Sequence, residues 1–247
     1  MDMQMNRFEH PLNEKTRIYL RLESLIRQIR HASTLSDPWQ HQVFFRGLFD
    51  LLEILEQIQL KSELAKDLDK QRTKLAQWLN IDGVDQTALQ EHLDHIDTAH
   101  RHLLATNRLG QTLREDRFLG AIKQRLSIPG GTCCFDLPVL HHWLHLPTTQ
   151  QQQDIKRWLN SIRELHVALH LLLRLIRGAA QSHAQIAKGG FFQQDAENAN
   201  LLRLDICPSH GVYPMISGHR GRFAIRFLPF EEGATIADTI DFQLAIC

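Results

Sequence analysis

The chain has 247 residues, of which 43% are hydrophobic, so it is long enough for one large domain or two smaller ones. Lys plus Arg and Asp plus Glu both number 28, which makes the formal net charge zero. A protein dedicated to binding DNA or RNA usually carries a clear basic excess, because neutralising phosphates dominates its affinity. The balanced charge therefore argues against that class of protein.

Neither export nor membrane insertion is predicted. The N-terminal residues contain no apolar segment flanked by basic residues, so they do not form a secretory signal. The most apolar run, residues 167–176, is interrupted by His170 and Arg174 and is too short to span a bilayer. The four cysteines form no Cys-x-x-Cys pair, as expected of free, buried thiols in a reducing compartment. The sequence predicts a cytoplasmic protein.

Up to about Ala180, apolar residues recur every three or four positions, which predicts α-helices. The expected helices cover roughly residues 14–31, 38–55, 64–78, 85–104, 113–126, 139–146 and 148–176. Asn13, Asp37 and Asp85 are placed to cap three of them. Thr148 and Gln151 form a capping-box pattern at the start of the last and longest helix, whose apolar positions keep a heptad rhythm. The glutamines there are expected to form a solvated first turn.

From about Ile186 onward, apolar and polar residues alternate, which predicts strands. The clearest strands are 201–206, 222–227 and 239–246, and the turn signals between them favour an antiparallel meander. Segments 5–9 and 131–136 are candidates for additional short strands. We therefore predict an α+β fold, in which an N-terminal α-helical bundle domain (12–181) is followed by a small antiparallel β-sheet domain (182–247).

The strand near residue 224 carries a cluster of arginines. Its period of two places Arg220, Arg222 and Arg226 on one face, opposite the apolar residues, and Arg203 of another strand can share that face. Like charges on one strand repel unless a negative group lies over them. Two interpretations remain open: pairing with acidic residues of neighbouring strands, or a grip on the carboxylates of a bound peptide.

The first helix is also rich in arginine, with Arg17 and Arg21 one turn apart and Arg27 and Arg30 further along. Such residues usually form a solvated helix face, and the alternative is the flank of an interface.

Histidines and catalytic motifs give no positive signal. His141 and His166 each have a second histidine four residues later, a spacing that lets two imidazoles share a cation. No HExxH motif or cysteine pair completes a metal site, and no P-loop, GxSxG or GxGxxG motif is present. We predict neither an enzyme nor a metal or other cofactor.

Five segments carry a likeness that spans the chain from Phe8 to its end. They are FEHPLNEK (8–15), LREDR (113–117), RLSIPGG (125–131), CCFDLPVLHHWLHLP (133–147) and SGHRGRFAIRFLPF (217–230). In sequence and order they resemble the signature segments of the ZapD family of Z-ring-associated proteins. The resemblance implies a symmetric homodimer that is recruited to mid-cell, binds the C-terminal tail of FtsZ and bundles FtsZ filaments, without catalysis or cofactor.

The resemblance also implies roles for single residues. Arg222 and Arg226 match the basic pocket that takes the FtsZ tail, which carries acidic and apolar residues, and Arg220 is a neighbour. At a corner where a basic residue is expected, the chain has Gln57, and Lys61 is the candidate replacement. The residues matched to the dimer interface are Arg21, Arg117 and His141, with Arg17 close by. A nucleic-acid-binding regulator that uses the basic β face is the alternative function.

Overall fold

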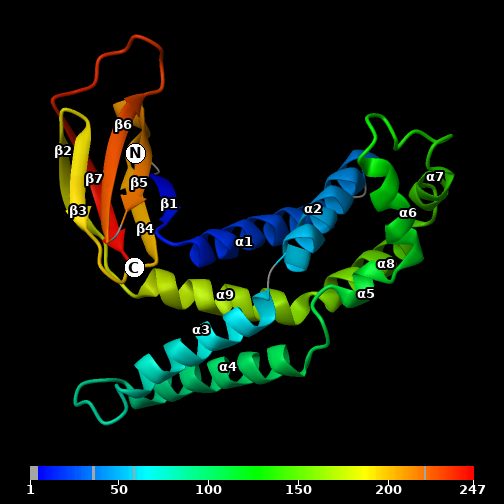
Figure 1. Cartoon of the computed structure of the whole chain (residues 1–247), viewed down its shortest axis with the longest axis horizontal. Coiled ribbons are helices and arrows are strands. Elements are labelled where there is room, and N and C mark those ends of the chain that lie inside the picture. The colour runs from blue at the N-terminus through cyan, green and yellow to red at the C-terminus, as the bar shows by residue number, and fades with distance from the viewer. Residues whose placement is uncertain (1–4, 35–36, 58, 220) are drawn as a thin grey trace. The chain divides into compact units, whose positions relative to one another are not determined.

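The structure is a computed structural model that describes residues 5–34, 37–57, 59–219 and 221–247. The chain divides into two compact units (Figure 1). The helical unit is Arg21–Leu172, and the β unit is Met1–Leu20 together with Leu173–Cys247. Nine helices precede most of the strands within the described residues, and all strand pairs are antiparallel, which confirms the predicted α+β class.

The helices begin at identifiable caps. They are α1 (Glu14–Ala32), α2 (Pro38–Gln57), α3 (Leu60–Ala76), α4 (Gln86–Ala105), α5 (Gln111–Arg114), α6 (Arg117–Leu126), α7 (Pro138–Leu144), α8 (Thr148–Ser161) and α9 (Arg163–Gly178). The predicted caps are confirmed: Asn13 accepts a hydrogen bond from the amide of Thr16 (2.8 Å), and Asp37 and Asp85 cap α2 and α4 in the same way. Asp116 caps α6, so the single helix expected over 113–126 is in fact two helices.

The longest predicted helix is also interrupted. Ile162 has φ −112° and ψ 9°, outside the helical region, and separates α8 from α9. The Ser161 hydroxyl donates to the carbonyl of Trp158 (2.6 Å), a local bond that competes with the helical ladder. The predicted capping box is wrong, because Pro147 is the N-cap and makes no side-chain bond. Gln151 is buried rather than solvated, and its amide donates to the carbonyl of Trp143 (3.0 Å).

An aromatic cluster holds α2, α6, α7 and α8 of the helical unit together. Phe118 stacks on Trp158 with ring centroids 5.7 Å apart, and Phe45 packs edge-on against Trp143 at 5.5 Å. Both indole N–H groups are satisfied, since Trp158 donates to Asp116 (2.9 Å) and Trp143 to a carboxylate of α8. In the same unit, α3 and α4 pack side by side as a helical hairpin (Figure 1).

His41 lies at the edge of this cluster and predicts a pH dependence of stability. Its ring packs edge-on against Trp143 at 5.1 Å, it is 1% exposed, and neither ring nitrogen bonds to a described residue. Burial lowers the pKa of His41, which Asp37 opposes weakly. The unfolded chain, with a histidine pKa of about 6.5, therefore binds this proton at a higher pH than the folded chain. The contribution of neutral His41 to stability is therefore fully present above the unfolded pKa, and it is lost as the pH falls from that value toward the lower pKa of the folded chain.

We therefore expect the free energy of unfolding to drop between pH 7.5 and 5.5, with a slope of at most about 1.4 kcal/mol per pH unit from this one proton. His41→Leu should drop less steeply. It should not become flat, because burial also lowers the pKa values of His10 and His166. Urea unfolding followed by tryptophan fluorescence at several pH values measures both slopes. Equal slopes in the two proteins would show that His41 does not titrate on unfolding.

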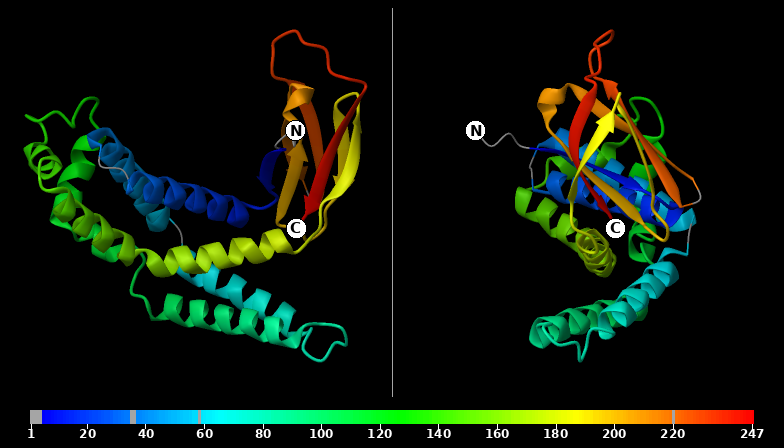
Figure 2. Two further views of the ribbon diagram at one scale, coloured as in Figure 1. Left: turned by 180° about the vertical axis from the view of Figure 1, so that it is seen from behind. Right: turned by 90° about the vertical axis from the view of Figure 1, so that its left-hand side faces the viewer.

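The β unit contains one seven-stranded antiparallel sheet with the order β1-β4-β7-β2-β3-β6-β5. Its strands are β1 (Asn6–Pro11), β2 (His183–Lys188), β3 (Phe191–Asp195), β4 (Leu201–Ile206), β5 (Val212–His219), β6 (Arg222–Pro229) and β7 (Thr239–Ile246). Figure 2 shows its twist from two further sides. The inward side chains of β4, β6 and β7 form the core, where the rings of Phe227 and Phe242 lie 5.2 Å apart.

The strand predictions are confirmed in part. The three clearest strands are β4, β6 and β7, and residues 6–9 of segment 5–9 fall in β1. The meander is wrong, because β4 and β6 are not neighbours and the predicted set of clear strands leaves out β2, β3 and β5. The strand expected over 131–136 is also wrong. These residues form successive turns, with the amide of Cys133 donating to Gly130 (3.1 Å), and Cys133 and Cys134 are exposed rather than buried.

Candidate partner-binding surface

The arginines of β6 lie on the outer face of the sheet, as the alternation predicts. Arg222 and Arg226 are exposed, whereas Phe223, Ile225 and Phe227 between and beside them are buried in the core of the β unit. The buried residues fix the direction of the strand, so the two guanidinium groups project from a rigid support.

Arg222 has a partner within the chain. It is in register with Asp195 of β3, and its Nε donates to the Asp195 carboxylate at 2.8 Å. The side chains of Arg222 and Asp195 are 60% and 68% exposed, and ion pairs as exposed as this one contribute about 0–1 kcal/mol. A competing carboxylate could therefore replace Asp195 at little cost.

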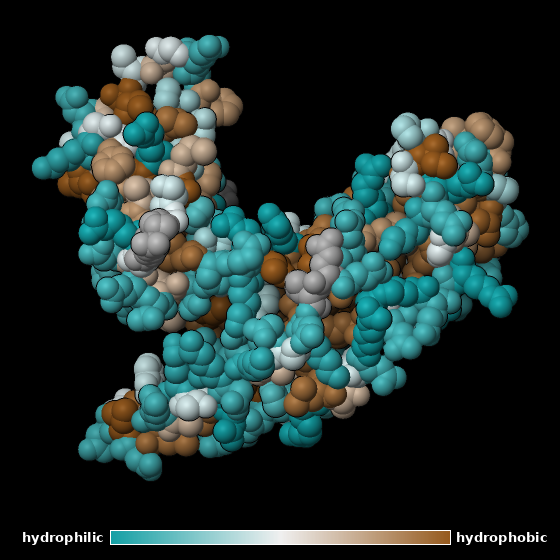
Figure 3. Space-filling view, in the orientation of Figure 1, coloured by the Kyte–Doolittle hydropathy of each residue, from teal (hydrophilic) through white to brown (hydrophobic). Residues whose placement is uncertain are grey.

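Arg226 has apolar neighbours instead. It is in register with Phe191 of β3 on one side and Met215 of β5 on the other, and these side chains are 45% and 56% exposed. Among the residues that the structure describes, Arg226 forms no ion pair. We call Phe191, Met215, Arg222 and Arg226 the β6 patch. Figure 3 shows hydrophobic and hydrophilic residues interleaved over the strands of this unit. The patch thus combines cations with exposed apolar surface.

The structure does not bring Arg203 to this patch. Three strands separate β4 from β6 in the sheet, and Arg203 is occupied elsewhere. Its Nη1 donates to the carbonyl of Arg177 at 3.0 Å, and its Nε lies 3.5 Å from a carboxylate oxygen of Glu9. Arg203 thus lies on the outer face as expected, but too far along the sheet to join the other arginines. Arg220 lies outside the described residues.

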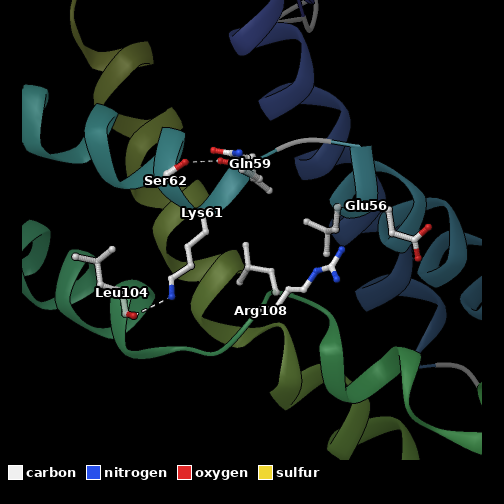
Figure 4. A pocket seen from close by; sticks show the side chains of 9 residues that line it. Glu56, Gln59, Lys61, Ser62, Leu104 and Arg108 are labelled. Carbon is white, nitrogen blue, oxygen red and sulfur yellow. Dashed lines mark hydrogen bonds between the residues drawn. The ribbon is translucent and has the colours of Figure 1, made fainter.

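Lys61 lies in the helical unit, in the first turn of α3. Its ammonium donates to the carbonyls of Leu104 (2.8 Å) and Thr106 at the end of α4. It lines a pocket of about 500 Å³ that also has four leucines in its walls. Figure 4 shows Lys61 directed toward Leu104, while Arg108 extends on the other side, toward Glu56. The side chain of Gln57 lies outside the described part of the chain.

Arg108 is a cation that the sequence did not indicate. It is exposed and forms no ion pair with any described residue, whereas the charge of Lys61 already faces two carbonyls. It lies in the irregular segment between α4 and α5, where no periodicity relates it to a face or to a partner.

The residues matched to a dimer interface are accessible. Arg21 and Arg117 are exposed and form no ion pair with the described residues of their own chain. His141 is exposed on α7. Arg17 is half-exposed and pairs with Glu14 of the same helix at 3.1 Å. Such side chains are available to a second copy of the chain.

Comparison with known proteins identifies the family. A family model described as "ZapD: Cell division protein" matches residues 20–226, most of the chain. The chain belongs to the ZapD family of cell division proteins. A "Cell division protein ZapD" of Photobacterium profundum is 71% identical over 245 residues, which cover 99% of this chain and all of the relative. Proteins of the same name from Vibrio vulnificus and Vibrio cholerae are 56% and 55% identical over the same shares of both chains.

Membership of the ZapD family supports a role in cell division. The matched span contains Arg21, Arg117 and His141 as well as both arginines of the β6 patch, while Arg17 precedes it. No helix within the described ranges is long and apolar enough to cross a membrane. In those ranges, no group of three or more His, Cys, Asp or Glu side chains is placed to hold a metal ion.

Proposed function

We propose that the chain binds the C-terminal tail of FtsZ through the β6 patch and, as a homodimer, cross-links and bundles FtsZ filaments at the mid-cell division site, which promotes Z-ring assembly. The observation that carries the proposal is the position of Arg226, an exposed cation between two exposed apolar side chains. A peptide with acidic and apolar residues side by side is complementary to that arrangement.

The chemistry of the patch favours carboxylates. A guanidinium presents planar pairs of N–H donors that match a carboxylate, so two arginines on one strand can bind two acidic side chains of an extended peptide. Phe191 and Met215 can cover the apolar residues between them. On binding, Arg222 would exchange the exposed carboxylate of Asp195 for a carboxylate of the peptide. Breaking the internal ion pair therefore costs little free energy.

Bundling requires two such patches in one particle. A single weak site binds a tail without joining filaments, whereas two sites on one dimer engage neighbouring filaments that each present many tails. In a two-fold symmetric dimer, the same surface of each copy meets the other. Arg21, Arg117 and His141 support this assembly because they are exposed, and Phe135 and Val139 before His141 add apolar surface that is 79% and 42% exposed.

Fluorescence anisotropy with a labelled FtsZ tail peptide tests the proposal. We expect saturable binding that weakens as salt rises, because exposed charges are screened beyond about 8 Å at physiological ionic strength. A peptide whose acidic residues are replaced by amides should not bind. Equal binding of both peptides would contradict a patch that recognises carboxylates. A specific gel shift with DNA or RNA would favour the nucleic-acid alternative instead.

The ion pair between Asp195 and Arg222 predicts a substitution that raises the affinity for the tail peptide. Asp195→Asn removes the carboxylate that competes for Arg222, so the affinity for the tail peptide should rise, by up to about fivefold for an exposed pair. Asp241→Asn, an exposed carboxylate on β7, changes the net charge equally and serves as the control. An equal gain in both variants would mean that only total charge matters, and a loss in Asp195→Asn would show that the pair holds Arg222 in its binding position.

A further inference from the structure

A second basic site lies in the helical unit, where α1, α8 and α9 meet. Its walls enclose a pocket of about 280 Å³. Arg30 of α1, Asn160 of α8, and Arg163 and His166 of α9 provide its polar side chains. Two residues that the proposed function leaves unused, Arg30 near the end of the first helix and His166, therefore line the same pocket.

The positive charges of the two arginines in this pocket are not neutralised by any described residue that lines it. Arg30 and Arg163 are exposed, and neither forms an ion pair with a described residue. No carboxylate is among the described side chains that line the pocket. The charge of Glu23 of α1 acts on His166, and this carboxylate pairs with Arg27 at 3.5 Å. Two arginines that line one pocket give it a positive potential, which favours an anion there.

The break between α8 and α9 creates this arrangement. Ile162 is buried and leaves the helical conformation, so α9 begins anew at Arg163. Arg163 and His166 are then three residues apart in the first turn of α9 and lie on the same face of that helix. An uninterrupted helix would have continued the direction of α8 past this point.

His166 adds sensitivity to pH. Its pKa is lowered by burial, by Arg30 and by His170, whose ring lies 6.1 Å away, and Glu23 acts in the opposite direction. A bound anion would favour the protonated ring, and by linkage a protonated ring would favour the anion. Binding should therefore tighten as the pH falls toward 6.

We propose that this pocket binds the phosphate group of a small molecule. Two guanidiniums can each donate paired N–H bonds to phosphate oxygens, the Asn160 amide offers a further donor, and His166 can supply one more when protonated. The pocket volume accommodates a phosphate or a small phosphate ester, and it lies near the lower limit of pockets that enclose a drug-sized ligand.

The test is isothermal titration of the full chain with inorganic phosphate, pyrophosphate and a nucleoside diphosphate, at constant ionic strength and at pH 6 and 8. We expect saturable binding that is tighter at pH 6. Arg30→Gln combined with Arg163→Gln should weaken it by at least about tenfold, because it removes two charged donors. Arg101→Gln combined with Arg125→Gln, two exposed arginines outside the pocket, should leave it unchanged.

Each outcome decides something. Binding of phosphate but not of the nucleoside diphosphate would define the ligand as the inorganic ion or a small ester, and the reverse preference would define it as a nucleotide. No saturable binding by the native chain, or equal binding after the Arg30 and Arg163 changes, would overturn the proposal. Circular dichroism and tail-peptide binding of the same variant show that a loss is not caused by unfolding, and they keep this site separate from the β6 patch.

Discussion

Arg222→Glu combined with Arg226→Glu should abolish co-sedimentation with FtsZ filaments. A hydrogen bond to a charged group is worth about 1.5–3 kcal/mol, so losing two such contacts and adding repulsion should weaken tail binding by at least about 100-fold. Both side chains point away from the core of the β unit, so the fold should persist. Sedimentation of the variant with assembled FtsZ, together with its circular dichroism spectrum, measures both effects.

A matched control is available in the helical unit. Arg101→Glu combined with Arg125→Glu changes two exposed arginines that form no ion pair with described residues. Each double variant converts two positive charges into two negative ones, so both lower the formal net charge from zero by four. The control should still bundle filaments. If the β6 variant also bundled, the patch would not be the binding site, and if neither did, total charge rather than position would explain the loss.

The second large effect is expected at the interface between two copies. Arg21→Glu combined with Arg117→Glu should give a monomer that still binds the tail peptide but no longer bundles filaments. Neither arginine forms an ion pair with a described residue of its own chain, so their replacement breaks no internal ion pair and acts only on the proposed contacts to a second copy. Size-exclusion chromatography with light scattering gives the mass, and light scattering of FtsZ mixtures reports bundling.

Two results would contradict this prediction. A variant that stays dimeric would place the interface elsewhere on the chain. A variant that is monomeric and still bundles would show that bundling does not need two linked sites. The control with Arg101 and Arg125 changed alters the same number of charges on the same unit, and it should remain dimeric because neither residue is matched to the interface.

The sequence predicts a helix boundary where a single capping residue precedes an apolar segment. It does not predict a boundary where the same residues are equally typical of a continuous helix. Asn13, Asp37 and Asp85 each stand directly before a periodic apolar segment, so their role as caps could be inferred. Asp116 stands within a run of charged residues that is equally typical of an exposed helix face, which hid the boundary between α5 and α6. The break at Ile162 left no mark in the heptad rhythm, because the apolar spacing continues through it.

The candidate site shows a similar division. The arginines of β6 could be assigned to one face, because that strand alternates cleanly between buried and exposed residues. Their apolar neighbours could not be predicted. Phe191 belongs to a short strand whose residues are mostly exposed, and Met215 follows Pro214 in a strand at the edge of the sheet. Because β3 and β5 are not predicted from the sequence, the apolar residues of the patch could not be placed beside Arg226.

Arg203 shows why a shared face requires strand order as well as alternation. Its side chain alternates outward from β4 as expected, yet the sheet order places β7, β2 and β3 between β4 and β6. Strand order depends on long-range pairing, which a single sequence does not reveal. An ion pair with Glu9 of β1 and a hydrogen bond to the carbonyl of Arg177 then hold Arg203 in place far from β6.

The most direct measurement compares full-length FtsZ with FtsZ that lacks its C-terminal tail, both assembled into filaments and sedimented with the native chain. If the dimer joins filaments by holding their tails, the chain should pellet with the full-length filaments, bundle them, and remain in the supernatant with the truncated ones. Equal pelleting and bundling with both kinds of filament would contradict tail recognition by the β6 patch.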